Sequence, residues 1–512
     1  MENSEKLKVL LVNPHGFDTS SVIPMSLAYL KANIKHPQNF EIEILDCSLL
    51  DIKASSYEFK ECIQRFTPAI VGITTWSPMF MEALDCAKAV KAVYPQACTV
   101  MGGPHATGYW ESVIENDEVD FVFRGESEND FSLFLDRVYE GSHDYQDIEG
   151  IVLKRENSSV LEGAVTLVDD LDALKLPDYD AIQLKQYIDR GYRYLTREKN
   201  NAPIWVTRGC PYRCEYCASP MISGKAVRKH SSQYLIDWVN DLKERYGIKH
   251  INIIDDNFTF DVRYAKNVCR DIADADLNVT ISTPNGIRME RGSGELWELM
   301  RKAGWRTMFV APESGSSNTL NLMKKDLDLD VVPPIVREMQ DAGLYVIGFF
   351  ILGYPGETYE DLIRTREFVV ECRFDFFKFH VFQAIPGTPI YDKLVKEGEI
   401  SSAYLPSEYH NFALATKPQP SYEFPDKVEA SVNSNEPKTP LTEHYKNPNL
   451  IGLSYRKYIV VTYFKFYTKH MLQALKLFRH FGWNFIILRV LNTFGLIKLI
   501  PGKATAINWA RK

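Results

Sequence analysis

TRGCPYRCEYC, residues Thr207–Cys217, is the most informative segment of this sequence. Its three cysteines, Cys210, Cys214 and Cys217, follow a C-x3-C-x2-C spacing at the end of a predicted strand. A loop this tight can point three sulfurs at one centre, and soft thiolates select zinc, copper(I) or iron–sulfur clusters. A structural zinc site usually closes with four ligands, often as two C-x-x-C pairs. No second pair is present, so a cluster that keeps one iron open fits better. Zinc with a distant fourth ligand and three incidental buried cysteines are the alternatives.

Around this loop, from residue 203 to residue 382, short apolar runs alternate with helical patterns. Six such units predict a partial (β/α)6 barrel of the TIM type, in which functional residues lie at the carboxyl ends of the strands. The predicted strands are Ile204–Thr207, His250–Ile254, Asn278–Thr283, Thr307–Ala311, Tyr345–Leu352 and Phe376–Phe382, and the predicted helices are Gln233–Tyr246, Arg263–Ala273, Gly294–Ala303, Val332–Ala342 and Tyr359–Cys372.

A second series of strands and helices precedes the barrel and predicts an α/β fold with a doubly wound, Rossmann-like parallel sheet. Its strands are predicted at Lys8–Asn13, Glu41–Asp46, Ala69–Thr74, Cys98–Met101 and Val119–Phe123, and its helices at Met25–Ala32, Glu58–Phe66, Met79–Val93 and Glu128–Tyr139. Ligands of such sheets bind beyond the carboxyl ends of the strands. The residues there are Asn13 and Pro14, Thr74, Thr75 and Trp76, Gly102, Gly103, Pro104 and His105, and Arg124, Gly125 and Glu126.

The remaining segments divide the chain into four parts: the first domain at 1–145, a linker at 146–200, the barrel at 201–395 and a C-terminal region at 396–512. A hairpin is predicted in the linker, at Gly150–Lys154 and Ala164–Val168. Residues 405–447 are rich in Pro, Ser, Asn, Glu and Lys and predict a long loop or lid. Residues 453–500 are apolar, aromatic and basic with helical spacing.

Charge is distributed unevenly along the 512 residues. The stretch from His444 to Lys512 carries +12 without any Asp or Glu, which leaves −20 on residues 1–443 of a chain whose net charge is −8. Because no run of about 18 uncharged apolar residues occurs, a membrane-spanning helix is not predicted. The C-terminal helices either cap the barrel or lie on an anionic membrane surface, and these two readings weigh evenly. Nucleic-acid binding is less favoured, because long aliphatic runs such as Phe485–Leu488 belong in cores or lipid.

The composition is that of a soluble globular protein, with 45% hydrophobic and 25% charged residues. The N-terminus has no secretory apolar segment, so we expect a cytoplasmic protein, with a peripheral location at the inner face of the membrane as an extension of that expectation. The six other cysteines are scattered among apolar segments and are expected to be reduced and buried.

The cysteine motif at the end of the first strand of a six-unit barrel resembles the radical S-adenosylmethionine (SAM) superfamily. The resemblance implies a [4Fe–4S] cluster on Cys210, Cys214 and Cys217, whose open iron chelates the amino and carboxylate groups of SAM. Reduction then cleaves the sulfonium and gives a 5′-deoxyadenosyl radical. The same resemblance implies SAM contacts by residues at later strand ends, namely Tyr216, Asp255, Asp256, Arg288, Glu313, Ser314, Gly315 and Gly353. Each has a structural alternative: loop packing, a helix cap, an ion pair or a tight turn.

The first domain resembles the cobalamin-binding domain that precedes many of these enzymes. The resemblance assigns to cobalamin the strand-end residues given above, from Asn13 and Pro14 to Arg124, Gly125 and Glu126. One departure matters: none of the eleven histidines follows an Asp by two residues, as the D-x-H-x-x-G motif requires. A cobalt ligand from that motif is therefore not expected. A doubly wound domain with no ligand is the alternative reading.

The two resemblances together predict a cobalamin-dependent radical SAM methyltransferase acting on an unactivated carbon or phosphorus centre. Ring closure or ring contraction by the same architecture is the first alternative, and a non-catalytic cobalamin- or membrane-associated binding protein is the second. The predicted partners are a small-molecule substrate, of lipid-like or polycyclic character, and an electron donor such as flavodoxin or ferredoxin. The sequence does not identify a catalytic acid, base or radical-quenching residue.

Overall fold

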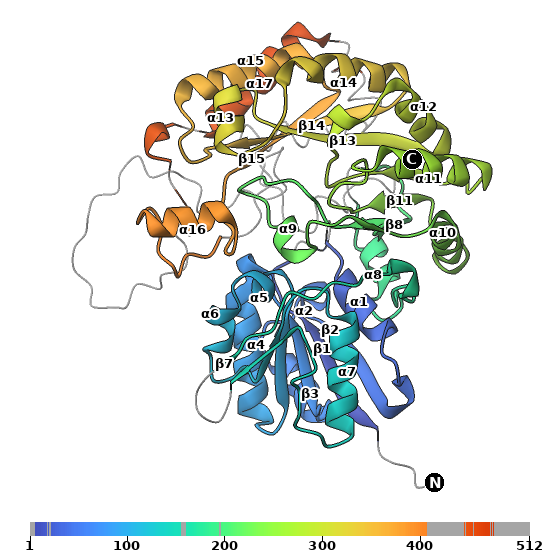
Figure 1. The fold of residues 1–512 in the computed structure, drawn as a ribbon, viewed down its shortest axis with the longest axis vertical. Coiled ribbons are helices and arrows are strands. Elements are labelled where there is room, and N and C mark those ends of the chain that lie inside the picture. The colour runs from blue at the N-terminus through green and yellow to red at the C-terminus, as the bar shows by residue number, and fades with distance from the viewer. Residues whose placement is uncertain are drawn as a thin grey trace.

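The computed structural model describes residues 6–17, 19, 22–154, 160–193, 196–406, 445, 447–453, 455–471, 473 and 475. Two α/β units are stacked, with the N-terminal domain below the barrel in the view of Figure 1. The short helix α9 (Ser219–Ile222), which follows the cysteine loop, lies between the two units (Figure 1).

The N-terminal domain is built on a seven-stranded sheet in the order β2-β1-β3-β4-β5-β6-β7. The five strands β1 to β5 pair only in parallel with one another. Helices α3 and α4 pack on one face, and α1 and α7 on the other, so the predicted doubly wound fold is confirmed. The strands are β1 Leu7–Asn13, β2 Phe40–Asp46, β3 Ile70–Thr74, β4 Cys98–Gly102 and β5 Phe121–Phe123, and the helices are α1 Met25–Ala32, α2 Cys47–Leu50, α3 Tyr57–Phe66, α4 Phe80–Val93, α5 Pro104–Gly108, α6 Trp110–Ile114 and α7 Glu128–Tyr139.

The predicted linker hairpin lies elsewhere than expected. Strands β6 (Ile151–Lys154) and β7 (Val160–Leu161) pair antiparallel and extend the first sheet. The second predicted strand, Ala164–Val168, instead makes only an isolated bridge between Thr166 and Gly125. The first sheet therefore continues beyond residue 145, because the edge of β5 pairs with the chain that follows it. Residues 171–192 hold α8 (Leu184–Asp189) and pack against the barrel core.

The second unit is a six-stranded, all-parallel sheet in the order β15-β14-β13-β12-β11-β8. Its two longest strands, β13 (Trp305–Glu313) and β14 (Tyr345–Leu352), are buried along most of their length, as strands covered on both faces are. The other strands are β8 Asn201–Ile204, β11 His250–Ile253, β12 Thr280–Ser282 and β15 Phe376–Val381, and the helices are α10 Ser232–Tyr246, α11 Val262–Asp274, α12 Gly294–Ala303, α13 Ser317–Leu322, α14 Val332–Asp341, α15 Tyr359–Cys372 and α16 Pro389–Lys396.

The C-terminal helix α17 (Tyr455–Lys469) covers the barrel beside its last strand. Tyr458, Ile459 and Phe466 are buried, and the hydroxyl of Tyr458 donates to the carbonyl of Leu362 in α15 at 2.6 Å. The capping interpretation of this stretch is therefore confirmed for α17. The lid predicted at 405–447 lies almost wholly outside the described residues, as does the chain beyond residue 475.

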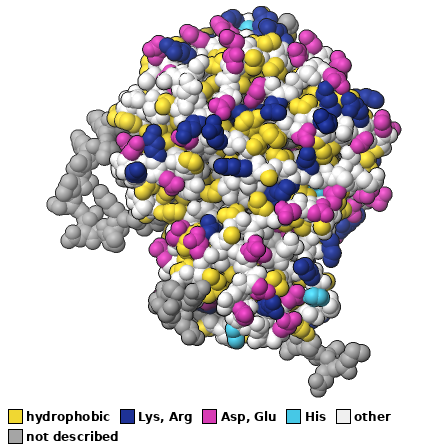
Figure 2. Space-filling model, viewed as in Figure 1, with side chains coloured by type: hydrophobic (Ala, Val, Ile, Leu, Met, Phe, Trp, Pro, Cys, Tyr) yellow, Lys and Arg dark blue, Asp and Glu magenta, His cyan; other side chains and the backbone are white. Residues whose placement is uncertain are grey.

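On the face shown in Figure 2, lysine and arginine side chains are interspersed with acidic ones over both units. That face offers no single basic field of the kind that phosphate backbones require. Among the described residues, no helix is both long enough and apolar enough to cross a bilayer.

Candidate functional site

The cysteine loop is held between β9 (Thr207–Arg208) and α9 by bonds to its backbone. The Cys210 N–H donates to the carbonyl of Gly224 at 3.0 Å, and the Cys217 N–H donates to the carbonyl of Cys214 at 3.2 Å. Gly209 makes the turn possible: its φ is +100°, and a Cβ there would lie 2.3 Å from the Ala226 carbonyl oxygen. The sequence places glycine where no larger residue fits.

The donor set of this loop fits a cluster. All three thiols are free, and Cys214 lies within electrostatic reach of both Cys210 and Cys217. Among the described residues, no three His, Cys, Asp or Glu side chains lie close enough together to hold a single metal ion. A cubane places each thiolate on a different iron, so its sulfurs stand wider apart than the ligands of one ion. Burial raises the pKa of the Cys217 thiol to about 11, and a bound cluster would supply the positive charge that the thiolate needs.

Tyr216 and Glu313, each of which was predicted to contact SAM, meet beside the cysteine loop. The Tyr216 hydroxyl donates to Glu313 Oε1 at 2.9 Å, and Lys325 Nζ lies 3.4 Å from the same oxygen. Glu313 ends β13 with a φ of +68°, a strained conformation for a residue with a side chain. Sequence reasoning missed Lys325, because it lies in the loop after α13 and no local pattern marks it.

The two aspartates that follow β11 have different roles. Asp255 is buried, and its carboxylate accepts from the N–H groups of Val206 and Thr207 at 2.7 and 2.9 Å. Asp256 accepts from the Gly209 N–H at 3.3 Å and lies near the thiols of Cys210 and Cys217. Asp255 therefore positions the strand that leads into the cysteine loop, and Asp256 is the carboxylate nearer the cluster site.

Arg288 is buried under the loop, with its guanidinium 3.8 Å from the centre of the Tyr212 ring. Its Nε lies 3.0 Å from Glu290 Oε1, and its Nη2 donates to the Asp326 carbonyl at 3.2 Å. Its Nη1 is buried with no hydrogen-bond partner among the described residues. This unsatisfied donor next to the cysteine loop suits an anionic group of a cofactor.

Three of the predicted SAM residues pack against helices. Ser314 shares a hydrogen bond with Thr365 Oγ1 at 3.0 Å. A Cβ on Gly315 would lie 2.4 Å from Phe368, and one on Gly353 would lie 2.3 Å from the Tyr455 hydroxyl. These glycines let α15 and α17 approach the strand ends closely. Any cofactor contact here would come from backbone atoms.

A second residue that sequence reasoning missed, the acidic Glu357, lies in the turn after β14. Glu357 is buried, its Oε2 accepts from the Gly353 N–H at 2.6 Å, and its Oε1 has no hydrogen-bond partner among the described residues. Burial raises the pKa of Glu357 to about 8. The G-Y-P-G-E-T pattern reads as a tight turn, so it gave no signal that its carboxylate is enclosed by α13 and α17.

In the N-terminal domain, β3 and β4 end in two interlocked loops. Thr75 N–H and Thr75 Oγ1 both bond the Gly102 carbonyl, at 2.7 and 2.8 Å, and the His105 N–H donates to the Thr75 carbonyl at 3.1 Å. Gly103 has a φ of +99°, and a Cβ there would lie 2.9 Å from the Thr75 carbonyl oxygen. Glycine here lets the two loops approach each other closely, at the edge of the sheet where ligands of such folds bind. Trp76 is partly exposed beside these loops and packs edge-on against Phe17.

The imidazole of His105 does not face this edge. It is 1% exposed, lies 3.0 Å from Ser77 Oγ through Nδ1, and packs against Phe80 with ring centres 4.3 Å apart. Burial lowers the pKa of His105 to about 3, so the ring is neutral. Contact with a ligand by the Gly102–His105 turn would come from its backbone, because the ring belongs to the core. Asn13 is likewise engaged inside, with its amide donating to Asp46 at 2.8 Å.

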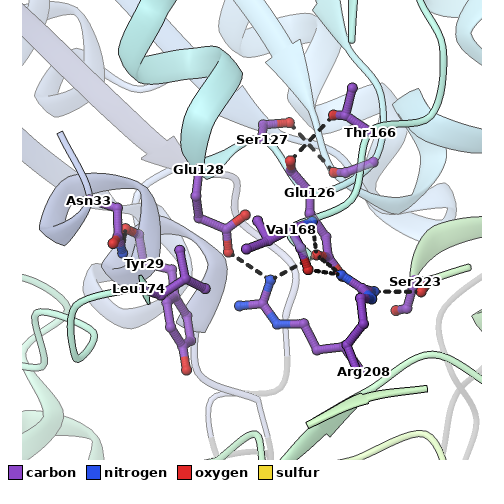
Figure 3. Close-up of polar contacts among 12 residues, drawn as sticks. Tyr29, Asn33, Glu126, Ser127, Glu128, Thr166, Val168, Leu174, Arg208 and Ser223 are labelled. Carbon is purple, nitrogen blue, oxygen red and sulfur yellow. Dashed lines mark hydrogen bonds and ion pairs between the residues drawn. The ribbon is translucent and has the colours of Figure 1, made fainter. Parts of the chain in front are cut away.

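The loop after β5 reaches the barrel. Arg124 donates to the carbonyls of Thr107 and Gly163, while Glu126 receives Arg208 and Arg228 from the barrel side (Figure 3). The side chains of this loop therefore hold neighbouring segments together. The carboxyl-end loops of the two sheets thus face one another across an interface that includes the cysteine loop.

Comparison with known proteins agrees with this architecture. Residues 204–369 match the family model of the radical SAM superfamily, and residues 19–135 match that of the B12 binding domain. The chain is 28% identical over 396 residues to an uncharacterized methyltransferase of Pyrococcus horikoshii, covering 75% of this chain and 83% of the relative. It is 26% identical over 446 residues to the cytidylyl-2-hydroxyethylphosphonate methyltransferase of Streptomyces wedmorensis, covering 76% and 82%.

A solved structure shares the fold. The radical SAM methyltransferase TsrM from Kitasatospora setae, with cobalamin and a [4Fe–4S] cluster bound, superposes with a TM-score of 0.65 at 18% identity. The match covers 77% of this chain and 78% of that one. The order and pairing of the two α/β units are thus those of a known arrangement.

The buried histidine predicts a pH dependence of stability. The pKa of His105 is about 3 in the folded chain and 6.5 in the reference state, so the unfolded chain binds the extra proton between these values. Stability is then fully present above pH 6.5 and falls as the pH drops toward 3, by about 1.4 kcal/mol per pH unit for this group. We expect His105→Gln to flatten the dependence of the free energy of unfolding on pH, measured by urea titration at pH 7, 6 and 5. The difference in slope should approach that value below pH 6.

The matched control is His143→Gln, since His143 is exposed. An unchanged slope in His105→Gln, equal to that of the control, would show that the imidazole is not held neutral in the core.

Proposed function

We propose that this chain, a member of the radical SAM superfamily with an N-terminal B12-binding domain, transfers a methyl group from SAM to an unactivated carbon or phosphorus centre of a small molecule. The observation that carries the proposal is the placement of three free thiols on a loop whose flanking residues, Arg208 and Met221, contact the ligand edge of the B12-binding domain. The cofactors are a [4Fe–4S] cluster, SAM and cobalamin. The methyltransferases among its relatives support methyl transfer as the outcome.

The proposed reaction consumes two molecules of SAM and two electrons. It converts R–H into R–CH3 and releases methionine, 5′-deoxyadenosine and S-adenosylhomocysteine. The hydrogen removed from the substrate is recovered in 5′-deoxyadenosine, and the methyl group comes from the second SAM. The cluster supplies the electron that cleaves SAM, and cobalamin supplies the methyl carrier. The electrons come from a donor of the flavodoxin or ferredoxin class.

The chain's own residues would bind and orient these groups. Asp256 offers an acceptor for the SAM amino group beside the cysteine loop, and the free Nη1 of Arg288 offers a donor for an anionic group. Tyr216 is fixed by Glu313, which gives the aromatic ring one orientation next to the loop. The interlocked turns at Thr75 and Gly103 would form the edge of the sheet against which cobalamin binds.

The test uses SAM labelled in its methyl group. We expect protein reconstituted anaerobically with iron, sulfide and hydroxocobalamin to form 5′-deoxyadenosine under dithionite, and to transfer the label out of SAM with formation of S-adenosylhomocysteine. The Cys210→Ala, Cys214→Ala, Cys217→Ala triple variant should lose the cluster absorbance and the 5′-deoxyadenosine. Mass spectrometry of the nucleosides and of recovered cobalamin measures both.

Cys62→Ala is the matched control, because Cys62 is a half-buried thiol of the N-terminal domain. If 5′-deoxyadenosine forms while the labelled methyl group is found only in methionine and unreacted SAM, the ring-closing or ring-rearranging alternative replaces methyl transfer. If the triple variant keeps its iron and its 5′-deoxyadenosine, the cluster assignment is wrong.

We further propose that the substrate is lipid-like or polycyclic and that the enzyme meets it at an anionic membrane. Support comes from the outward side of α17 and the residues after it. Phe464, Met471 and Leu475 are 70%, 74% and 58% exposed, and Lys465 and Lys469 are exposed among them. Apolar side chains next to basic ones give the two signals that stable surface binding needs.

We expect the full chain to co-sediment with vesicles of phosphatidylserine and phosphatidylcholine, and to release as salt rises, because exposed charge is screened. Phe464→Ser with Met471→Ser should weaken sedimentation several-fold by removing the apolar signal. Tyr57→Ser, at a side chain 71% exposed on the N-terminal domain, is the control. Equal sedimentation with pure phosphatidylcholine, or none with either, would refute the membrane proposal and leave methyl transfer intact.

A further inference from the structure

Four buried charged side chains join the two α/β units. We call Glu126, Glu128, Arg208 and Arg228 the interdomain ion cluster; their side chains are 9%, 8%, 7% and 8% exposed. Glu126 and Glu128 come from the loop after β5 and the start of α7. Arg208 and Arg228 face each other across the two-stranded β9–β10 sheet, with β10 at Arg228–Lys229. Two positive and two negative charges make the cluster neutral.

Glu126 is the centre of this cluster (Figure 3). Arg228 binds it with both nitrogens, Nη1 to Oε2 at 2.5 Å and Nη2 to Oε1 at 2.7 Å. Glu126 Oε2 also accepts from the Val168 N–H at 2.9 Å and lies 3.3 Å from Arg208 Nη1. Arg208 Nη1 lies 2.9 Å from Glu128 Oε1. A forked pair of this kind fixes orientation as well as distance.

The cluster is bonded directly to both ligand edges. On the barrel side, Arg208 is two residues before Cys210, and Arg228 Nη2 donates to the Ser223 carbonyl at 2.7 Å. The next residue, Gly224, accepts from the Cys210 N–H at 3.0 Å. On the other side, Glu126 follows Gly125 at the end of β5. Two short paths therefore run from the edge of the B12-binding domain to the first cysteine of the loop.

A second contact closes the interface on another side. Met221 of α9 is wedged between the domains: its Sδ lies 2.3 Å from where a Cβ of Gly108 would stand, and 2.6 Å from that of Gly387. Gly108 ends α5 of the N-terminal domain, and Gly387 follows β15 of the barrel. Because the interdomain ion cluster and Met221 hold the interface on two sides, the ligand edges of the two units have little freedom to slide past each other.

The free-energy cost of burying these four charges indicates that the cluster sets the position of one α/β unit relative to the other. Buried ion pairs repay their desolvation only when every group is well placed, and well-packed apolar residues are often as stable. Here Nε and Nη2 of Arg208 are buried without a hydrogen-bond partner among the described residues, and the guanidinium stacks on the Tyr29 ring at 4.9 Å. An apolar interface would cost less but would allow more than one docking register. Buried charge that must pair specifies a single register.

We infer that Arg208, with Glu126 and Glu128, is a positioning residue that fixes the ligand edge of the B12-binding domain relative to the cysteine loop. This inference rests on the proposed function, because two cofactors must act on one substrate. Arg208 touches no reacting atom; it acts through Cys210 and through the loop after β5. Its loss would leave each cofactor bound but would misplace one against the other.

The test compares Arg208→Lys and Glu128→Gln with Arg245→Lys, a control at an exposed ion pair with Asp180. The first variant keeps the charge but loses the guanidinium, whose Nη1 contacts both Glu126 and Glu128 and whose plane lies over the Tyr29 ring. The second removes one carboxylate while Glu126 stays. We expect cluster content, cobalamin content and 5′-deoxyadenosine formation within twofold of the parent. Methyl transfer per 5′-deoxyadenosine should fall by about 10- to 100-fold, because small misplacements of reacting groups cost rate steeply. A merely structural role would lower both products together.

Two readouts do not depend on turnover. In the loaded protein, the magnetic broadening between the reduced cluster and Co(II) should change in both variants and stay unchanged in Arg245→Lys. In the protein without cofactors, amide hydrogen exchange should rise at 124–128 and 205–210 and stay constant in β13 and β14. Unchanged broadening and exchange in Arg208→Lys would overturn the inference even if methyl transfer occurs. If no methyl transfer is found in the parent, these two readouts still decide whether the cluster fixes the domains.

Discussion

The structure depends on one constraint: two parallel sheets, each with its ligand edge at the carboxyl ends of its strands, must present those edges to one another. Neither edge is a regular surface, since both are made of loops. The chain meets the constraint with paired charge, joining the buried side chain of Glu126 to those of Arg228 and Arg208. Because a buried charge has no tolerable position away from its partner, these pairs select one arrangement of the domains.

Local sequence patterns predicted most of the fold. Alternating strand and helix periodicities predicted both sheets, and the C-x3-C-x2-C spacing marked the loop at the end of the first barrel strand. What they could not predict depends on residues far apart in the chain. Glu126 looked like a strand-end ligand, yet its partner Arg228 lies 102 positions away. His105 looked equally available, because nothing next to it in sequence reveals that Ser77 and Phe80 enclose its ring.

Glycines show the same limit in another way. Gly103 and Gly209 have positive φ and press against backbone carbonyls, so turn chemistry alone identifies them. Gly315 and Gly353 make room for Phe368 and Tyr455, side chains of helices that pack on the barrel, although Gly353 also has a positive φ of +80°. From sequence, all four resemble the flexible turns of a binding loop. Only the packing separates glycines that bring two backbone segments together from glycines that admit a helix.

The helix that crowds Gly353 also bears on the chemistry. A six-stranded partial barrel has open edges at β8 and β15, and α17 covers the second of these with Tyr458, Tyr463 and Phe466. The Tyr463 hydroxyl donates to the Phe377 carbonyl at 2.7 Å, which ties the helix to the last strand. A carbon radical must be shielded from solvent and from stray hydrogen donors until it meets its partner. Covering the barrel edge with aromatic packing and closing the domain interface with paired charge are two solutions to that single requirement, one apolar where only shielding is needed and one ionic where orientation is needed as well.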